Sequence, residues 1–354
     1  MTTKAQNDHL VEHVRCLMPF PTFGHLDSDG SWRLNVSGVI RHPYAPTLRK
    51  RMLIRMLAKV MHASEEDLSS ETFRNRVASF VMDGAHGHQI GCSIGKRNFL
   101  LPKKTKRNGH FSGWLALDPA FVKTLSTRDA AEPLQISLSL NSDRLPDADA
   151  LAEIHLVPLR GVSVISDIDD TIKESAIGDR RELLANTFLR EFRCVSGMSE
   201  VYQQWLTRRV AFHYVSSSPW QLLPWITEMM QAWNFPSGSL HLRDFRLRNH
   251  MLQRMIRLRR SGKTTAIKLL LMKFPFRKFI LVGDSGEKDL EIYRKTAACF
   301  PHQVTGILIR ELPHHPLDPE RLDKCRTALP HVLCKRFETA AELKAIAEPL
   351  LSGN

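Results

Sequence analysis

The chain has 354 residues, of which 43% are hydrophobic and 25% charged, and this composition excludes a disordered, collagen-like or low-complexity protein. No window approaches the roughly 18 uncharged apolar residues of a transmembrane helix, and the first twenty residues lack the apolar core of a signal peptide. Lys and Arg number 50 against 37 Asp and Glu, and the resulting net charge of +13 favours anionic partners such as nucleic acid, an acidic membrane or phosphorylated substrates.

The six cysteines are scattered and include no CxxC pair. Dense disulfide frameworks belong to oxidising compartments, so this usage fits a reducing cytoplasm. We therefore expect a cytoplasmic protein without a transmembrane segment.

Residues 1–157 are predicted to form an antiparallel, β-rich N-terminal domain. Apolar and polar residues alternate at 32–40, 77–82 and 135–140, and turn-forming residues separate these runs. A helix is predicted over 47–62, where apolar residues recur among Arg and Lys at helical spacing.

From residue 158 the pattern changes to α/β. Short, continuous apolar runs, typical of strands buried on both faces, occur at 162–165, 210–215, 240–242, 279–282 and 305–309. Helical stretches lie between them at 198–207, 220–233 and 263–273. This alternation predicts a doubly wound parallel sheet over 158–312, whose ligands bind beyond the carboxyl ends of the strands. Residues 313–354 are expected to be a helical tail that completes this domain.

The first predicted strand ends in three carboxylates within four residues, Asp167, Asp169 and Asp170, followed by Thr171. Close like charges raise each other's pKa unless a cation or hydrogen bonds neutralise them. A turn rarely needs three carboxylates, so this pattern favours a Mg²⁺ site over a structural turn.

The next strand ends in Ser216-Ser-Ser218, just before a helix. Hydroxyls and backbone N–H groups at a helix N-terminus suit a phosphoryl group, although serine-rich caps are also common without a ligand. The segment Ser261-Gly-Lys263-Thr264 resembles a nucleotide P-loop, but Arg257 stands where that motif requires glycine, so a P-loop is excluded. Lys263 instead begins a helix, from which it can reach a neighbouring strand end.

A further buried strand ends in Gly283 and Asp284, with Asp289 five residues later. Gly283 permits close backbone approach, and the two carboxylates can face a cation directly or through water. Together the strand ends supply a nucleophilic carboxylate, a second acid, a hydroxyl, a lysine and metal-binding carboxylates. These are the components of phosphoryl transfer through an aspartyl phosphate.

This ordered set resembles the four motifs of the haloacid dehalogenase superfamily. Asp167-Ile-Asp169-Asp170-Thr171 matches its DxDxT signature, Ser216 its second motif, Lys263 its third, and Gly283-Asp284 with Asp289 its fourth. The strings SDIDDTIK, YVSSSPWQLLPW and KFPFRKFILVGDSGEKDLEIY further resemble the actin-patch-type phosphatidate phosphatases, which are related in motif to the lipins. The resemblance implies a haloacid dehalogenase-like parallel sheet after the β-rich domain.

The resemblance also implies residue roles. Asp167 is the nucleophile, and Asp169 protonates the leaving alkoxide and then activates water. Ser216 and Lys263 bind the phosphoryl oxygens, and Thr171 braces the loop. Mg²⁺ is held by Asp167, the backbone carbonyl of Asp169 and Asp284, with Asp289 orienting the metal shell. The role of Asp170 stays open between capping and assisting the metal.

The expected activity is Mg²⁺-dependent hydrolysis of phosphatidate to diacylglycerol and phosphate. The stretches that could carry a cap domain, 172–197 and 244–262, are short, and an open site suits a bulky or membrane-embedded ester. The basic, partly apolar segment 243–263 is either a membrane-contacting face at the inner membrane surface or a solvated helix packed on the core. Nucleic acid is disfavoured, because this segment lacks interleaved aromatics.

Two alternatives stay open. One is a related phosphatase that acts on another anionic phosphomonoester, since members of one fold family need not share a substrate. The other is a catalytically idle, basic protein that binds membrane or nucleic acid. Retention of Asp167, Asp169, Lys263 and Asp284 argues against idleness.

Overall fold

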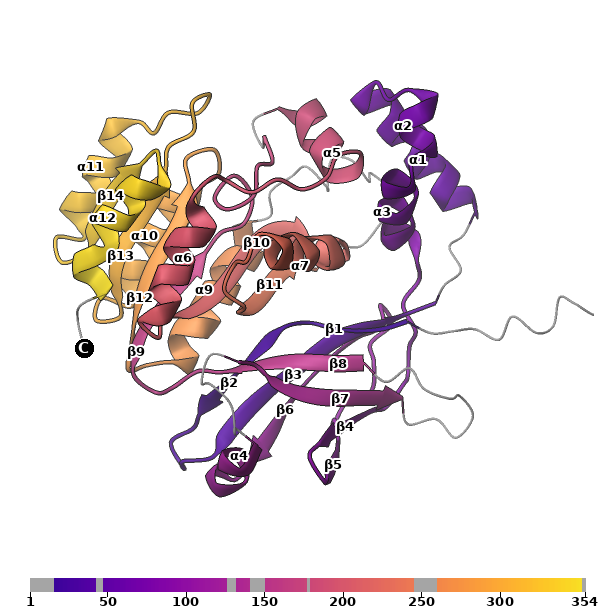
Figure 1. Ribbon diagram of the computed structural model, residues 1–354, viewed down its shortest axis with the longest axis horizontal. Helices are drawn as coiled ribbons and strands as arrows, with labels where there is room; N and C mark the ends of the chain where they lie inside the picture. The colour runs from indigo at the N-terminus through magenta and orange to yellow at the C-terminus, as the bar shows by residue number, and fades with distance from the viewer. Residues whose placement is uncertain are drawn as a thin grey trace, which may run out of the picture.

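A computed structural model describes residues 16–42, 47–125, 132–140, 150–176, 179–244 and 260–351. The chain has a mixed α/β fold built on two sheets, one β-rich and mostly antiparallel, the other parallel (Figure 1). At this level the prediction from hydrophobic periodicity is confirmed.

The first sheet carries eight strands in the order β1-β3-β2-β8-β7-β4-β5, with β6 paired to β3. All of its pairings are antiparallel except β2 with β8. The strands are β1 (Cys16–Pro19), β2 (Thr22–Leu26), β3 (Trp32–Arg41), β4 (Ile90–Ile94), β5 (Arg97–Leu100), β6 (His110–Leu117), β7 (Leu134–Leu140) and β8 (Ala150–Leu156). Short helix α4 (Pro119–Leu125) follows β6.

Three helices interrupt this sheet between β3 and β4. They are α1 (Thr47–Met61), α2 (Glu65–Ser69) and α3 (Glu71–Val81). The predicted helix at 47–62 is confirmed by α1, whereas the strand predicted at 77–82 is wrong because those residues belong mainly to α3. Phe73, Val77, Phe80 and Val81 are buried at helical spacing, and a six-residue window cannot separate that period from alternation.

The second sheet is parallel throughout, with the order β11-β10-β9-β12-β13-β14. Its strands are β9 (Gly161–Ser166), β10 (Ala211–Pro219), β11 (Ser239–Arg243), β12 (Arg277–Asp284), β13 (Val304–Arg310) and β14 (Leu333–Phe337). The strand β14 lies in the tail for which only helices were expected. The chain order reverses beside β9, so the ends of β9 and β12 lie at the crevice where ligands bind in such sheets.

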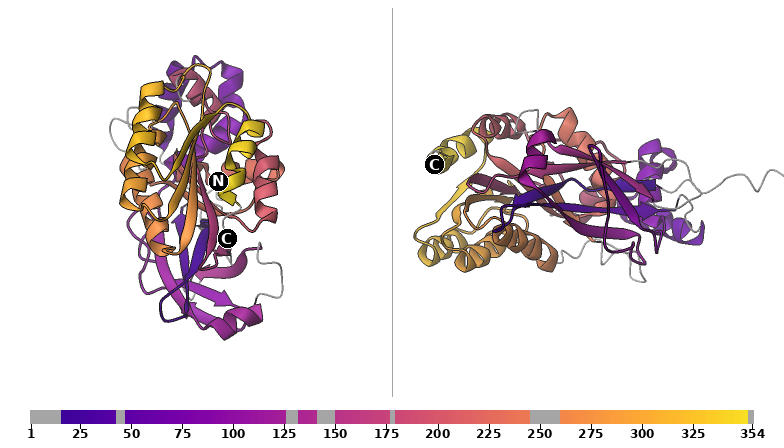
Figure 2. Two further views of the ribbon diagram at one scale, coloured as in Figure 1. Left: turned by 90° about the vertical axis from the view of Figure 1, so that its left-hand side faces the viewer. Right: turned by 90° about the horizontal axis from the view of Figure 1, so that it is seen from below.

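Helices cover both faces of this sheet (Figure 2). One face packs against α6 (Met198–Thr207), α7 (Leu223–Ala232) and α12 (Ala340–Leu351), and the other against α9 (Arg260–Lys273), α10 (Asp289–Cys299) and α11 (Pro319–Ala328). The apolar residues of α1 and α3 join the first of these cores, near helix α5 (Arg180–Phe188) and the short 3₁₀ helix η1 (Trp220–Leu222). Helices α1–α3 therefore pack on the parallel-sheet half, although in the sequence they lie between β3 and β4 of the β-rich half.

Candidate active site

Asp167 lies directly after β9 at the carboxyl edge of the parallel sheet. Its backbone N–H donates to the carbonyl of Val282 on the adjacent strand β12 at 2.8 Å, which extends the strand pairing to the acidic loop. The Asp167 side chain is 1% exposed, and the hydroxyl of Thr171 approaches its Oδ2 at 3.4 Å. The strand pairing thus holds a buried carboxylate at the carboxyl edge of the parallel sheet.

Asp170 braces the loop that carries these carboxylates. Its φ is +54°, a left-handed conformation that aspartate tolerates better than most residues. Its Oδ1 accepts the N–H groups of Ser175 and Ala176 at 2.6 and 2.9 Å, and its carbonyl accepts from Arg310 at 2.8 Å. The Asp170 carboxylate therefore caps two backbone N–H groups of this loop.

Lys263, near the start of α9, lies among three carboxylates. Its Nζ donates to Oδ1 of Asp167 at 2.7 Å, to Asp289, and to Oε2 of Glu287 at 3.4 Å. The Lys263 side chain is only 1% exposed. One buried cation thus contacts residues from the ends of β9 and β12 and from the start of α10.

Burial and charge act in opposite directions at this cluster. Burial raises the pKa of Asp167 well above its usual range, and the neighbouring carboxylates add to the increase while Lys263 opposes it. Burial likewise raises the pKa of Asp284, helped by Asp289 and Glu287. Burial would lower the pKa of Lys263, but Asp167 and Asp289 outweigh it and raise that pKa. A single lysine therefore does not offset four buried carboxyl groups, and a further cation would favour their ionised forms.

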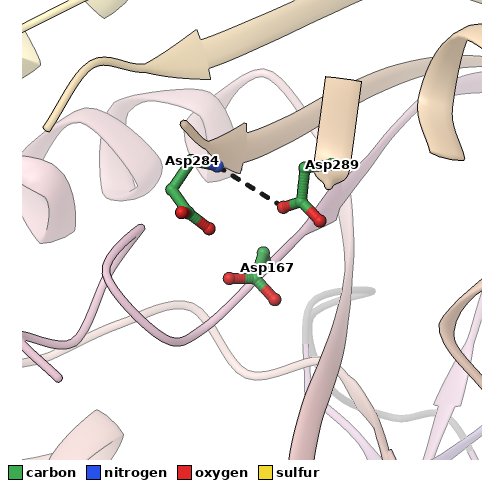
Figure 3. A group of neighbouring side chains, drawn as sticks. All are labelled: Asp167, Asp284 and Asp289. Atoms are coloured by element: carbon green, nitrogen blue, oxygen red, sulfur yellow. Dashed lines mark hydrogen bonds between the residues drawn. The ribbon is translucent and has the colours of Figure 1, made fainter. Parts of the chain in front are cut away.

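The arrangement fits a divalent cation. One oxygen from each of Asp167, Asp284 and Asp289 can lie within 4.8 Å of the others, and Figure 3 shows the three carboxyl groups converging. Oδ1 of Asp284 accepts the N–H groups of Gly286 and Glu287 at 2.7 and 2.9 Å. Its Oδ2 is buried and accepts no hydrogen bond from the described residues. This oxygen of Asp284 lies in a group of three carboxylates, and Mg²⁺ prefers oxygen ligands of this kind.

Gly283 makes this convergence possible. A Cβ atom at that position would lie 2.2 Å from Oδ2 of Asp289. The Asp289 carboxylate therefore occupies the space that any other residue at 283 would fill.

Asp169 points into a second, separate network. Its Oδ2 accepts from Ser216 at 2.8 Å and from Ser218 at 2.6 Å, while its Oδ1 lies 2.7 Å from both the Lys173 ammonium and the Ser175 hydroxyl. Burial would raise the pKa of Asp169, but Lys173 and these hydroxyls outweigh it and hold the pKa well below its usual value. The Asp169 side chain is therefore a carboxylate in this state and lies outside the three-carboxylate group.

The structure thus brings the predicted site residues into two adjoining groups. The first group contains Asp167, Lys263, Asp284 and Asp289. The second contains Asp169 and Ser216. Sequence reasoning missed Lys173, Ser175 and Glu287, and gave Ser218 no role. Lys173 and Ser175 follow the acidic run closely, yet short spacing alone does not show that side chains turn back toward Asp169. Burial raises the pKa of Glu287 to about 7.

Comparison with known proteins finds a family similarity over the parallel-sheet half of the chain. Residues 162–311 match the family model described as the catalytic domain of phosphatidate phosphatase APP1. This part of the chain is similar to the catalytic domain of that family. The matched region contains every predicted site residue.

Two curated proteins extend the similarity. Phosphatidate phosphatase APP1 of Saccharomyces cerevisiae is 34% identical over 218 residues, which are 60% of this chain and 37% of that protein. An uncharacterized protein of Schizosaccharomyces pombe is 31% identical over 206 residues, 56% of this chain and 33% of that protein. The chain therefore spans about a third of the length of these relatives.

A solved Thermotoga maritima structure aligns with 53% of this chain and 99% of its own, at a TM-score of 0.34 and 11% identity. That similarity is too low to define the fold. Among the described residues, no helix combines the length and apolar character needed to cross a bilayer.

Proposed function

We propose that this protein is a Mg²⁺-dependent phosphatidate phosphatase that releases diacylglycerol and phosphate through an aspartyl phosphate on Asp167. The observation that carries the proposal is the buried Asp167 paired to Lys263 beside Asp284 and Asp289, within a segment that matches a phosphatidate phosphatase catalytic family. A phosphoric monoester hydrolase needs a nucleophile, charge neutralisation and an acid–base group, and each is available here.

The proposal includes a haloacid dehalogenase-like catalytic domain at 158–312, a β-rich domain at 1–157, and a tail at 313–354 that completes the catalytic domain. It is supported by the parallel strand order around β9 and by the change of sheet between β8 and β9. Pairing of β14 with β13 supports including the tail.

Asp167 is the nucleophile in this proposal. A carboxylate oxygen of Asp167 forms a bond to phosphorus as the bond from phosphorus to the ester oxygen breaks, and the electron pair stays on the leaving oxygen. The Lys263 ammonium, 2.7 Å from Oδ1, neutralises charge on the acyl phosphate and the phosphoryl oxygens. Thr171 positions the other carboxylate oxygen.

Asp169 is the acid and base. It must first hold a proton, although Lys173 and the surrounding hydroxyls favour its carboxylate form. An incoming phosphate adds a like charge and competes for the hydroxyls of Ser216 and Ser218, and both effects raise the Asp169 pKa. Asp169 then gives its proton to the leaving alkoxide, and as a carboxylate accepts a proton from the water that cleaves the acyl phosphate.

Mg²⁺ would be held by the carboxylates of Asp167 and Asp284 and by the backbone carbonyl of Asp169. Asp289 would orient the surrounding shell of the metal. When bound, the metal supplies positive charge that offsets the charge of the phosphoryl group. Ser216 donates its hydroxyl to the phosphoryl oxygens in this arrangement, in place of its contact with Asp169.

The proposed location is the cytoplasm, with peripheral contact at the inner membrane surface. The net charge of +13 supports attraction to anionic lipid. Most of the basic segment 243–263 that was expected to make this contact lies outside the described residues, namely 245–259. Membrane contact is therefore supported by charge and by the family match alone.

The test is hydrolysis of phosphatidate in mixed micelles with Mg²⁺, compared with sugar phosphates and nucleotides, with Asp167→Asn assayed alongside. Phosphate release from phosphatidate that Asp167→Asn abolishes is the expected result. Turnover of soluble esters alone would refute the lipid substrate. No turnover of any ester, combined with binding to anionic vesicles or nucleic acid, would favour the idle-protein alternative.

A further inference from the structure

A cavity of about 500 Å³ lies beside the proposed phosphoryl site. Ser216, Ser217 and Lys263 line it on the side of the catalytic groups. Much of the remaining wall is apolar and comprises Phe20, Trp220, Leu223, Leu240, Leu242 and Leu269. Most ligand pockets share this pattern of an apolar wall with a few placed polar groups.

The wall is built from both halves of the molecule. Phe20, between β1 and β2, and Ser37, on β3, come from the β-rich half, whereas Leu240 and Leu242 lie on β11 of the parallel sheet. The backbone N–H of Leu240 donates to the carbonyl of Pro21 at 2.9 Å, and the N–H of Phe20 donates to Ser37 at 2.9 Å. The first of these hydrogen bonds joins the two halves beside the cavity, and the second holds Phe20 against β3 within the β-rich half.

The ring of Phe20 is held in an aromatic group. Its centroid lies 6.2 Å from that of Trp220 and 5.7 Å from that of His110, and His110 and Trp220 meet edge to face at 5.0 Å. Phe20 remains half-buried, so part of its surface is available to a ligand. A ring fixed in this way offers an apolar surface at little further cost in conformational entropy.

We propose that this cavity binds the leaving-group alcohol of the substrate and that Phe20, together with the wall at Ser37, makes the β-rich half a determinant of specificity. The inference rests on the proposed function for the placement of the phosphoryl group at Ser216 and Lys263. The apolar wall favours alcohols that carry hydrocarbon groups over fully hydroxylated ones. Arg243 and Asp244 add charged groups to the lining, which suits an ester that carries polar and hydrocarbon parts together.

The test measures binding of n-alkyl phosphonates, from methyl through butyl to octyl, by calorimetry with the full chain and Mg²⁺. These compounds are not hydrolysed, so the readout does not require turnover. We expect affinity to rise about two- to fourfold per methylene until the cavity is filled, because each buried methylene contributes a similar increment. Phe20→Ala should flatten this dependence, and the matched control Phe276→Ala should not, because Phe276 is 59% exposed and does not line the cavity.

A second variant guards against loss of folding in Phe20→Ala. Ser37→Phe fills the cavity from the same wall and should weaken octyl phosphonate at least tenfold while leaving methyl phosphonate within twofold. Affinity that does not change with chain length, or that both variants leave unchanged, would overturn the inference even if phosphatidate is hydrolysed. The expected binding pattern without turnover of any ester would instead overturn the phosphatase function, and the cavity would then be a binding site for alkyl chains rather than for a leaving group.

Discussion

The Nζ atom of Lys263 lies 2.7 Å from Oδ1 of Asp167, and each of these side chains is 1% exposed. The contact joins residues 96 positions apart and is shielded from water, so it is weakly screened by salt. Two further carboxylates, Asp289 and Glu287, contact the same ammonium group. Removing the ammonium group would therefore leave three buried carboxylates without this cation.

Asp167→Asn should lower kcat at least ~10³-fold, because the amide cannot act as the nucleophile. Steady-state kinetics measure kcat and KM separately. An unchanged kcat, or a loss confined to KM, would contradict the covalent role.

Lys263→Met should destabilise the fold by about 3–5 kcal/mol, because three buried carboxylates lose their cation. Urea unfolding at neutral pH measures the change. Lys278→Met is the control, because Lys278 is exposed and, among its described hydrogen bonds, donates only to the carbonyl of His302. This variant should lower the free energy of unfolding by about 0.5 kcal/mol or less. Equal losses for the two variants would argue against a buried ion cluster.

Asp169→Asn should lower the single-turnover rate of leaving-group release about 10²- to 10⁴-fold for alkyl phosphates and much less for p-nitrophenyl phosphate, whose phenolate leaves without a proton. The ratio of the two rates isolates the acid role from general damage to the site. The acid assignment fails if both substrates slow by the same factor.

Mg²⁺ should raise the free energy of unfolding, by about 2.7 kcal/mol at a concentration of 100 times its Kd, because the ion binds only where the buried carboxylates converge. Thermal unfolding with Mg²⁺ and with EDTA measures this shift. Asp284→Asn should remove it, whereas Asp323→Asn, at an exposed position on helix α11, should retain it. Persistence of the shift in Asp284→Asn would place the ion elsewhere.

His155, on β8, predicts a pH dependence of stability. Burial lowers its pKa from 6.5 to about 4, so the unfolded chain binds the proton more readily than the folded one. The contribution of His155 to stability is fully present above pH 6.5 and is lost as the pH falls toward 4, and the difference amounts to about 3 kcal/mol. His155→Phe should flatten the decline in unfolding free energy across this window, and His86→Phe, at an exposed position, should leave it intact.

Periodicity and motif spacing predicted much of the parallel sheet and the strand ends that carry Asp167, Ser216 and Asp284. These predictions succeed because strands buried on both faces must be continuously apolar, and because ligands bind where such strands end. The prediction of a strand at 77–82 was wrong. The residues of α3 that are buried depend on the core that this helix packs against, and the sequence of the helix alone does not show that core. Strand β14 was likewise hidden in a tail with helical signals on both sides.

The sequence alone determined which chemical groups are available, because the residue types that follow each apolar run can be read from the sequence directly. Only the tertiary structure decided how those groups divide, with Lys263 among Asp167, Asp289 and Glu287, and Asp169 among Ser216, Ser218 and Lys173. It also decided that the β-rich half supplies Phe20 to the cavity wall. Contacts between residues distant along the chain depend on how sheets and helices pack, and that packing is a property of the whole core rather than of any short segment.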